Sequence, residues 1–453
     1  TLDDFRRFVR KARDLGIEIA IDVALTCSHD HPWIREHPGW FFRDPDGSIR
    51  CAENPPKKYE DTVFLNFFPP DREEMWNELR SVFDFWIEQG VSIFRVDNPH
   101  TKPDEFWGWV IRKVKDVHPE AVFLSEAFTF YERLERLAKL GFSQSYTYFT
   151  WRNEKNELIE YLDRLCGITV NDYLRPNLFA NTPDILTKFL QESGRQGFVM
   201  RYALAATLAP TCGIYSGFEL CEADGIPGTE SYVDSEKYEI KIRDWNRPGN
   251  IKDAVAAVNR IRRENPALHH LDNLWFCPST DHRVLAYMKV SPDRANVVLV
   301  VANLDPAETR RSRVTVPLRR IGFASGEDYR AVDLFSGKAY SCRGRDCYMR
   351  MDPRVDPVHV YRLERGGPPA RPPADHDEAR AHADELFRLR ERVIRGSDLM
   401  ARREMMRLFD EVIAPRICAG SGHDDAYHPA IDAEARRRGF DSIVEAWTAT
   451  PGH

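Results

Sequence analysis

Two short, mostly apolar stretches in the first third of the sequence each end on a carboxylate. The first runs from Phe94 to Asp97 and the second from Phe123 to Glu126. Strands of a parallel sheet are buried on both faces and are almost wholly apolar, so a terminal acid is out of place unless it has a chemical role. In a β/α barrel, the carboxyl ends of the strands form the active site. The pattern therefore predicts two acids on neighbouring strand ends, which is the arrangement that retaining glycoside chemistry uses.

Helix and strand signals alternate over residues 2–220, which predicts a parallel sheet with right-handed crossovers. After an N-terminal amphipathic helix, strand signals occupy residues 17–25, 91–96, 121–124, 146–149, 177–180 and 213–215, and helix signals occupy residues 71–89, 103–117, 154–164, 183–194 and 197–208. Residues 28–70 are expected to form a loop. About six βα units follow Thr1, whereas a closed barrel needs eight. We therefore expect a (β/α)₈ TIM barrel that is N-terminally incomplete in this chain.

The pattern changes after the expected catalytic barrel of residues 1–265. Residues 266–365 contain short β-rich runs separated by turn residues, which predicts an antiparallel β-sandwich. Residues 366–374, GGPPARPPA, form a predicted linker. Residues 375–453 are charged and helical in pattern, and we expect a helical tail whose role the sequence does not indicate.

Composition excludes several classes of function. The net charge of −7 gives no basic surface for nucleic acid. No apolar run approaches the roughly 18 residues of a membrane span, so no membrane association is expected. The nine cysteines form no close CxxC pair, which favours a reducing, cytoplasmic location. Histidines between His29 and His37 lack a metal-binding spacing, and no Gly-rich phosphate loop occurs, so neither a metal nor a cofactor is implied.

The two acids lie within four motifs that resemble those of the alpha-amylase superfamily of retaining glycosidases and transglycosylases. The motifs are IDVA at 21–24, FRVD at 94–97, LSE at 124–126 and NTPD at 181–184. The resemblance implies that Asp97 is the nucleophile, that Arg95 orients it and that Glu126 is the general acid/base. It also implies that Asp184 holds sugar hydroxyls and that Asp22 is an orienting residue near the pocket.

Simpler interpretations of these acids remain open at the level of sequence. Asp97 and Glu126 are also compatible with an ordinary ion pair at strand ends. Asp184 is compatible with an acid at a helix N-terminus, where the helix dipole favours negative charge.

Further runs resemble one subgroup, the maltosyltransferases that use alpha-maltose 1-phosphate. They are HDHPW at 29–33, NPPKKY at 54–59, DNPHTKP at 97–103, YFTWRN at 148–153 and DSEKY at 234–238. Thr26 and Cys27 stand where ordinary amylases have Asn and His, and Pro183 stands where they have a second His. Because both histidines normally touch the sugar, the departures disfavour an ordinary starch hydrolase. The resemblance covers residues 2–363.

The resemblance also implies residues that bind a phosphorylated donor. Four of them would surround the phosphate: Asn54, Lys57, Tyr59 and Asn98. A phosphate leaving group needs positive charge and hydrogen-bond donors, which these side chains supply. Asp61 would bind donor hydroxyls, and Lys237 and Tyr238 would face the second glucose. From the residues alone, a solvated pair in a loop is the favoured explanation of Lys57 and Lys58, and the resemblance reverses that preference for Lys57.

We therefore expect a transferase that moves maltosyl units from alpha-maltose 1-phosphate to an α-1,4-glucan and releases phosphate. The family implies a homodimer for the full-length protein. Two alternatives stay open: another enzyme of the superfamily, such as a hydrolase or a trehalose-forming isomerase, and a non-catalytic glucan-binding protein. The first alternative differs in that such an enzyme would process its sugar without releasing inorganic phosphate. The second is disfavoured because the catalytic acids are intact.

Overall fold

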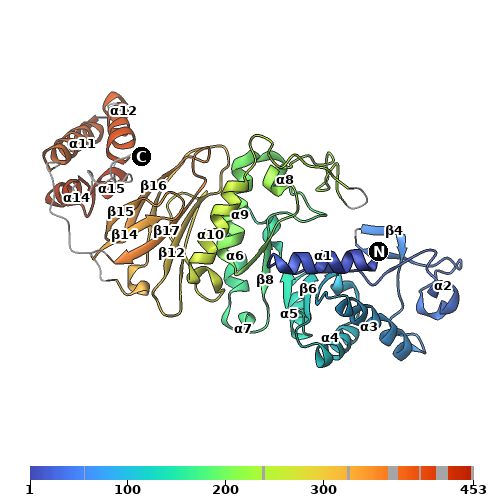
Figure 1. The fold of residues 1–453 in the computed structure, drawn as a ribbon. Helices are drawn as coiled ribbons and strands as arrows, with labels where there is room; N and C mark the ends of the chain where they lie inside the picture. Colours follow the sequence, from blue (N-terminus) through green and yellow to red (C-terminus); the bar gives the residue numbers. More distant parts are fainter. Residues whose placement is uncertain are drawn as a thin grey trace. The chain divides into compact units, whose positions relative to one another are not determined.

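The structure is a computed structural model that describes residues 1–55, 57–236, 240–323, 327–365, 376–396, 399–414 and 427–449. The chain divides into two compact units. The first comprises Thr1–Thr150 and Asp163–Phe179, and the second comprises Trp151–Leu162 and Ala180–His453. Each unit is described by itself below, with the element labels of Figure 1.

The first unit is built on parallel strands in the order β1, β5, β6, β7, β8. Their bounds are Ala20–Val23, Ile93–Asp97, Val122–Glu126, Gln144–Tyr146 and Pro176–Phe179. The helices of this unit are α1 Leu2–Asp14, α2 Trp33–Glu36, α3 Arg72–Glu88, α4 Asp104–Val117, α5 Tyr131–Lys139 and α7 Ile168–Asn171. The predicted alternation of strands and helices is confirmed, with strand β1 shorter than the predicted 17–25. The strand predicted at 146–149 was misplaced, because β7 ends at Tyr146 and Tyr148–Trp151 forms a short 3₁₀ helix.

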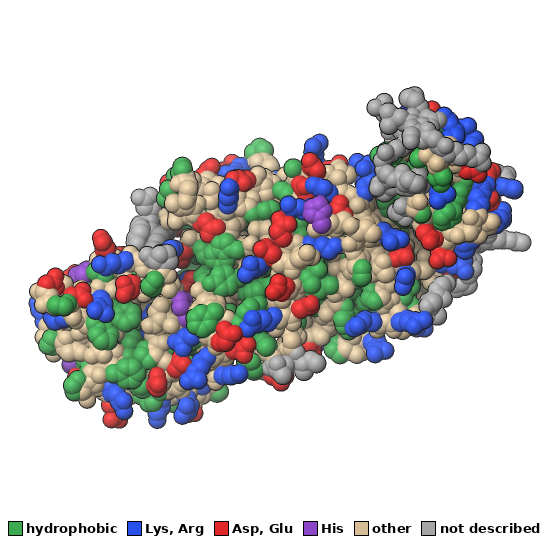
Figure 2. Space-filling model, turned by 180° about the vertical axis from the view of Figure 1, so that it is seen from behind, with side chains coloured by type: hydrophobic (Ala, Val, Ile, Leu, Met, Phe, Trp, Pro, Cys, Tyr) green, Lys and Arg blue, Asp and Glu red, His purple; other side chains and the backbone are tan. Residues whose placement is uncertain are grey.

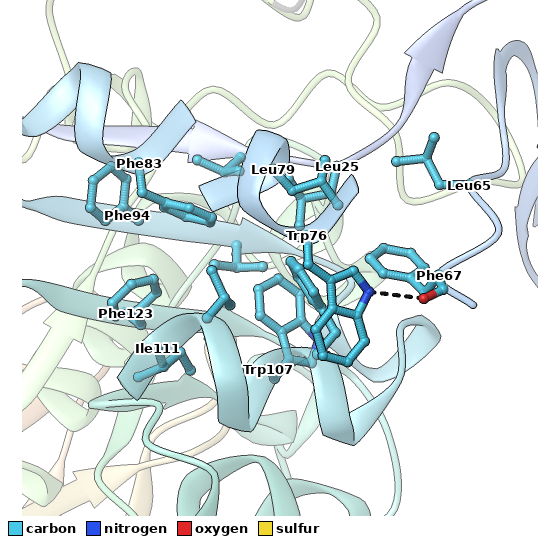
Figure 3. Close-up of a cluster of buried hydrophobic side chains, with 14 of the residues drawn as sticks. Leu25, Leu65, Phe67, Trp76, Leu79, Phe83, Phe94, Trp107, Ile111 and Phe123 are labelled. Atoms are coloured by element: carbon cyan, nitrogen blue, oxygen red, sulfur yellow. Dashed lines mark hydrogen bonds between the residues drawn. The ribbon is translucent and has the colours of Figure 1, made fainter. Parts of the chain in front are cut away.

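Helices α3 and α4 bury an aromatic core against strands β5 and β6 (Figure 3). Phe83 of α3 lies with its ring 5.0 Å from that of Phe94 on β5 and 5.5 Å from that of Phe123 on β6. Trp76 donates its indole N–H to the carbonyl of Phe67 at 2.8 Å, which satisfies the polar atom of a buried ring. This packing fixes the strands whose ends carry the acids.

The segment between β1 and α3, which the sequence analysis treated as a loop, contains a small antiparallel sheet. Its strands are β2 Cys27–Ser28, β3 Cys51–Asn54 and β4 Lys57–Val63, in the order β2-β4-β3. Strand β4 is exposed along most of its length, so its sequence lacks the apolar alternation by which a strand is recognised. The prediction of a loop was wrong for this reason.

The second unit begins with helices that precede an antiparallel sheet. The helices are α6 Lys155–Leu165, which crosses the unit boundary, α8 Lys188–Glu192, α9 Gly194–Leu208 and α10 Lys252–Glu264, and a short strand β9 covers Thr211–Gly213. The predicted helix at 183–194 starts late. Thr182 and Ile185 exchange both backbone hydrogen bonds, 3.1 and 3.2 Å long, around a tight turn. Pro183 presets the backbone for that turn, so the helix starts only at Lys188.

Residues 274–365 form a six-stranded antiparallel sheet in the order β10-β11-β12-β17-β14-β15 and a two-stranded sheet of β13 and β16. The bounds are Leu274–Cys277, Val284–Val290, Val297–Asn303, Arg310–Thr315, Asp328–Asp333, Ala339–Arg343, Asp346–Met351 and Val358–Arg365 for β10 to β17. Val284, Val301 and Val314 are among the side chains of the apolar core that the strands enclose.

Beyond this sheet the chain forms a cluster of helices (Figure 1). They are α11 His376–Gly396, α12 Leu399–Arg407, a π-helical turn at Leu408–Ile413, α14 Tyr427–Arg437 and α15 Ile443–Thr448. The predicted linker 366–374 lies outside the described residues. No helix in the described part of the chain is long and apolar enough to cross a bilayer. Figure 2 shows basic and acidic side chains interspersed over the face in view.

Candidate active site

The carboxyl ends of β5 and β6 bring the two predicted catalytic acids side by side. Asp97 is the register partner of Glu126 in the parallel pair. Neighbouring strands lie about 4.8 Å apart, so the two side chains leave the sheet at a spacing close to the roughly 5–5.5 Å that separates the carboxyl groups of a retaining mechanism. The side chain of Asp97 is 32% exposed and that of Glu126 is 9% exposed. One acid therefore faces an accessible space while the other is enclosed.

Arg95 joins the acids from the same face of the sheet. It precedes Asp97 by two residues on β5, so both side chains point the same way. Its Nη1 donates to Asp97 Oδ1 at 3.0 Å and to Asp22 Oδ2 at 2.8 Å, and its Nη2 lies 3.6 Å from Glu126 Oε1. The arginine therefore holds three carboxylates in one fixed arrangement.

This electrostatic arrangement keeps Arg95 charged. Burial by itself lowers the pKa of Arg95, but the carboxylates of Glu126, Asp22 and Asp97 outweigh it and raise the pKa above its ordinary value. A planar, permanently charged guanidinium is suited to such a bridging role. The predicted orienting residue Arg95 thus lies in contact with the predicted nucleophile and acid, and the predicted orienting residue Asp22 is joined to them through Arg95.

Asn98 follows the nucleophile in a left-handed conformation with φ of 43°. This conformation, which asparagine tolerates better than most residues, turns its backbone N–H toward Glu126 Oε2 at 3.1 Å. Its side-chain Nδ2 donates to Asp97 Oδ2 at 3.1 Å. One residue therefore contacts both acids.

Three of the four predicted phosphate residues come from the β3–β4 hairpin that the sequence analysis took for a loop, and the fourth, Asn98, follows β5. Asn54 ends β3 opposite Lys57 at the start of β4. Lys57 and Tyr59 occupy alternate positions of β4 where it pairs regularly with β3, so they share one face, whereas Lys58 points to the other. Asp61 lies beyond Tyr59, where the register with β3 shifts. Asn54 Nδ2 donates to Asn98 Oδ1 at 2.9 Å, which ties this hairpin to the catalytic acids.

The remaining predicted residues are not brought to these acids within one unit. Asp184 lies in the second unit, in the turn between Thr182 and Ile185, with its N–H donating to Thr182 Oγ1 at 3.2 Å. It is not the first-turn acid of a helix, because α8 starts only at Lys188, so that alternative is wrong. Lys237 and Tyr238 lie outside the described residues.

Lys102 is a functional candidate to which sequence reasoning gave no role. Its side chain is only 4% exposed, and its Nζ donates to the carbonyls of Asp97 at 3.0 Å and Asn98 at 3.3 Å. Burial lowers the pKa of Lys102 to about 8, against the opposing effect of the nearby carboxylates. The residue stands within the DNPHTKP run, but only its burial under the strand end distinguishes it from a surface lysine.

His100 was likewise missed. Its Nε2 lies 3.3 Å from Asn54 Oδ1. Arg133 of α5 fixes the surrounding loop by donating to the backbone carbonyls of His100 at 3.2 Å and Lys102 at 3.0 Å. No group of His, Cys, Asp or Glu side chains suited to hold a metal occurs among the described residues. The site therefore consists of paired acids, a bridging arginine and a set of amide donors.

Comparisons with known proteins identify the relatives of this chain. A family model described as "GLGE, C-terminal" matches residues 276–363. The chain is 49% identical over 363 residues to the alpha-1,4-glucan:maltose-1-phosphate maltosyltransferase of Rhodospirillum rubrum. The aligned region covers 80% of this chain and 53% of the relative. It is 50% identical over 369 residues to the protein of that name from Pseudomonas aeruginosa, and this alignment covers 80% of this chain and 55% of the relative.

The chain is a homologue of these maltosyltransferases. It spans about half the length of the curated relatives it matches. Among solved structures, a maltogenic alpha-amylase from Thermotoga neapolitana superposes with a TM-score of 0.63 at 17% identity over 81% of this chain and 82% of the other. An alpha-amylase from Anoxybacillus superposes with a TM-score of 0.64 at 15% sequence identity, and the match covers 82% of this chain and 80% of the other. The fold is accordingly alpha-amylase-like, with a β/α-barrel sheet followed by an antiparallel β domain and C-terminal helices.

Proposed function

We propose that this protein transfers maltosyl units from alpha-maltose 1-phosphate to the non-reducing end of α-1,4-glucans and releases inorganic phosphate. The observation that carries the proposal is the hydrogen bond between Asn54 and Asn98, because it joins the predicted phosphate residues to the paired acids. Homology to maltosyltransferases over four fifths of the chain supports the same substrate class.

The first half of the reaction breaks the bond from the anomeric carbon to the phosphate. A carboxylate oxygen of Asp97 attacks the anomeric carbon, and Glu126 gives its proton to the departing phosphate oxygen. Arg95 keeps Asp97 oriented through the Nη1–Oδ1 contact of 3.0 Å. Amide N–H groups of Asn54 and Asn98, with Lys57 and Tyr59, stabilise the negative charge that develops on the phosphate. The product is a β-maltosyl ester of Asp97.

The second half releases the ester to a glucan. Glu126, now a carboxylate, takes the proton of the acceptor's 4-hydroxyl, and that oxygen attacks the anomeric carbon while the bond to Asp97 breaks. Two inversions give net retention. Asp184, Asp61, Lys237 and Tyr238 are proposed to hold the sugars of the donor. The catalytic groups return to their starting protonation, so each cycle adds one maltosyl unit.

The nucleophile is tested by substitution and by trapping. We expect Asp97→Ala to abolish phosphate release, since no other carboxylate occupies its register position opposite Glu126 among the described strands. A 2-deoxy-2-fluoro donor should leave a covalent adduct on the peptide that contains Asp97, detected by mass spectrometry. An adduct on another peptide, or full turnover by the variant, would contradict the assignment.

The phosphate subsite is tested by comparing two donors. Lys57→Ala should weaken turnover of maltose 1-phosphate by about 10- to 150-fold more than turnover of maltosyl fluoride, because a charge-assisted hydrogen bond is lost only with the phosphate. Lys58→Ala is the matched control, since its side chain lies on the other face of β4. Phosphate release without any dependence on added glucan, or sugar processing without phosphate release, would favour a hydrolase or an isomerase instead.

A further inference from the structure

Four polar side chains form a continuous chain of hydrogen bonds that ends at the nucleophile. Asn98 Nδ2 lies 3.1 Å from Asp97 Oδ2, and Asn54 Nδ2 lies 2.9 Å from Asn98 Oδ1. His100 Nε2 lies 3.3 Å from Asn54 Oδ1. The residues come from three places, the end of β5, the short helical turn Pro99–Thr101 after it and the end of β3.

The direction of every hydrogen bond in this chain follows from its last member. An ionised carboxylate only accepts, so Asn98 must turn its NH₂ toward Asp97 and its oxygen away. The oxygen of Asn98 must then accept from the NH₂ of Asn54, which turns the oxygen of Asn54 toward His100. That oxygen needs a donor, so Nε2 of His100 must carry the hydrogen.

The surroundings of His100 suit a neutral ring with its hydrogen on Nε2. The other ring nitrogen, Nδ1, is buried and has no hydrogen-bond partner in the described structure. A hydrogen placed there would be a buried donor without an acceptor, which costs more than a bare lone pair. Burial lowers the pKa of His100 to about 4, and the charges of Lys102 and Arg133 act in the same direction against the opposing charge of Asp97.

We propose that His100 is a positioning residue that, through its Nε2–H, holds the amide of Asn54 in the orientation that completes the chain from Asp97 and Asn98, so that the N–H groups of both asparagines are available to the leaving phosphate. The inference rests on the proposed function and goes beyond it by naming what orients the phosphate donors. Each amide NH₂ donates one hydrogen within this chain of hydrogen bonds, and its second hydrogen is left to donate to an anion. With either amide flipped, an oxygen would face the phosphate and repel it.

The tautomer is tested without any turnover. ¹⁵N-histidine spectra of the intact protein should contain a ring in the neutral Nε2–H form at pH 6, where an ordinary histidine is largely protonated. Loss of that signal in His100→Gln assigns it. If His100 is an imidazolium at this pH, or carries its hydrogen on Nδ1, the proposed hydrogen-bond chain from His100 to Asp97 is wrong, whatever reaction the protein catalyses.

The effect on the donor is tested with two variants of opposite hydrogen-bonding capacity. His100→Phe keeps a planar ring and removes the donor, so kcat/KM for maltose 1-phosphate should fall about 2- to 12-fold further than kcat/KM for maltosyl fluoride. His100→Gln can place an amide N–H at the same point and should restore the ratio between the donors. Thermal unfolding of both variants is recorded beside the kinetics.

The outcomes separate the two proposals. Equal losses for both donors in His100→Phe, or no recovery in a folded His100→Gln, would overturn the positioning role. A wild-type protein that releases no phosphate from maltose 1-phosphate would overturn the proposed function. The tautomer of His100 would still show whether the hydrogen-bond chain from His100 to Asp97 exists. In a double-mutant cycle, Asn54→Ala and His100→Phe should be non-additive, since the histidine acts through the asparagine.

Discussion

The clearest residue-scale feature is the concentration of charge at the end of β5. Arg95 and Lys102 are both nearly enclosed, and each contacts Asp97, one through the carboxylate and the other through the backbone carbonyl. Buried cations of this kind are stable only where partners surround them. The site therefore depends on both charges being present together.

Lys102 provides a prediction about pH. Because burial lowers its pKa to about 8 from an ordinary 10.5, the ammonium beside Asp97 is lost as the pH rises through 8. We expect kcat/KM for the donor to fall above that pH. Lys102→Arg keeps its charge and should move the fall to higher pH. Phosphate release measured from pH 6 to 10 in both proteins checks this.

Unfolding does not account for that expected loss of activity. Between pH 8 and 10.5 the unfolded chain binds the proton of Lys102 more tightly than the folded chain does. The contribution of this lysine to the free energy of unfolding therefore rises with pH over this window. Circular dichroism should show folded protein where turnover has declined. A wild-type profile that is flat to pH 10 would contradict the role of the ammonium.

At the scale of elements, the packing of α3 on β5 and β6 determines where the acids lie. Phe83 is fully buried between the two strands, whereas Phe85 of the same helix is 41% exposed. A strand end is positioned only as well as the apolar face beneath it is packed. The catalytic geometry thus rests on aromatic residues that never touch a substrate.

Phe83→Ala tests this dependence. We expect it to lower the free energy of unfolding by about 3–5 kcal/mol, the usual cost of removing a buried phenyl ring. Phe85→Ala, the matched control on the same helix, should cost much less because its ring is already partly in water. Urea unfolding followed by circular dichroism measures both. Equal costs for the two substitutions would contradict the described packing.

On the scale of the whole molecule, the C-terminal helices form an apolar cluster of their own. Its members lie between Ala379 and Trp447, with Phe409 and Trp447 stacked at 4.6 Å. Tyr348 of β16 packs against it, with its ring 5.3 Å from that of Phe409. None of the proposed site residues belongs to this cluster in the described structure.

We therefore predict that removing the residues after Arg365 changes the rate of maltose 1-phosphate turnover by no more than about two-fold, since groups that share no partners contribute nearly additively and no proposed site residue belongs to the helical cluster in the described structure. Its β domain should lose some thermal stability because the ring of Tyr348 becomes exposed. Phe409→Ala in the longer chain is the control for that contact. A truncated protein that is folded but inactive would assign the helices a part in the reaction.

Sequence by itself determined the paired acids and their partner Arg95. The order of apolar runs specifies parallel strands, and in parallel strands every carboxyl end lies at the same edge, so Asp97 and Glu126 had to be neighbours. Residue spacing also specified that Arg95 and Asp97 share a face, because side chains alternate along a strand. These features follow from the order of the apolar runs and the two-residue alternation of side chains along a strand, both of which can be read from one sequence.

Local pattern did not show which polar groups meet at those acids. The resemblance implied Asn54 and Asn98, and only the tertiary structure decided how these two residues come together. The hairpin of β3 and β4 brings Asn54 to Asn98 across 44 residues of chain, and exposed strands leave no apolar period to reveal it. The tight turn at Pro183 was likewise hidden, since its defining feature is a pair of backbone hydrogen bonds. The burial of Lys102 and the tautomer of His100 depend on neighbours from separate elements. A hydrogen bond between distant residues is a property of the packed chain, and local pattern does not encode it.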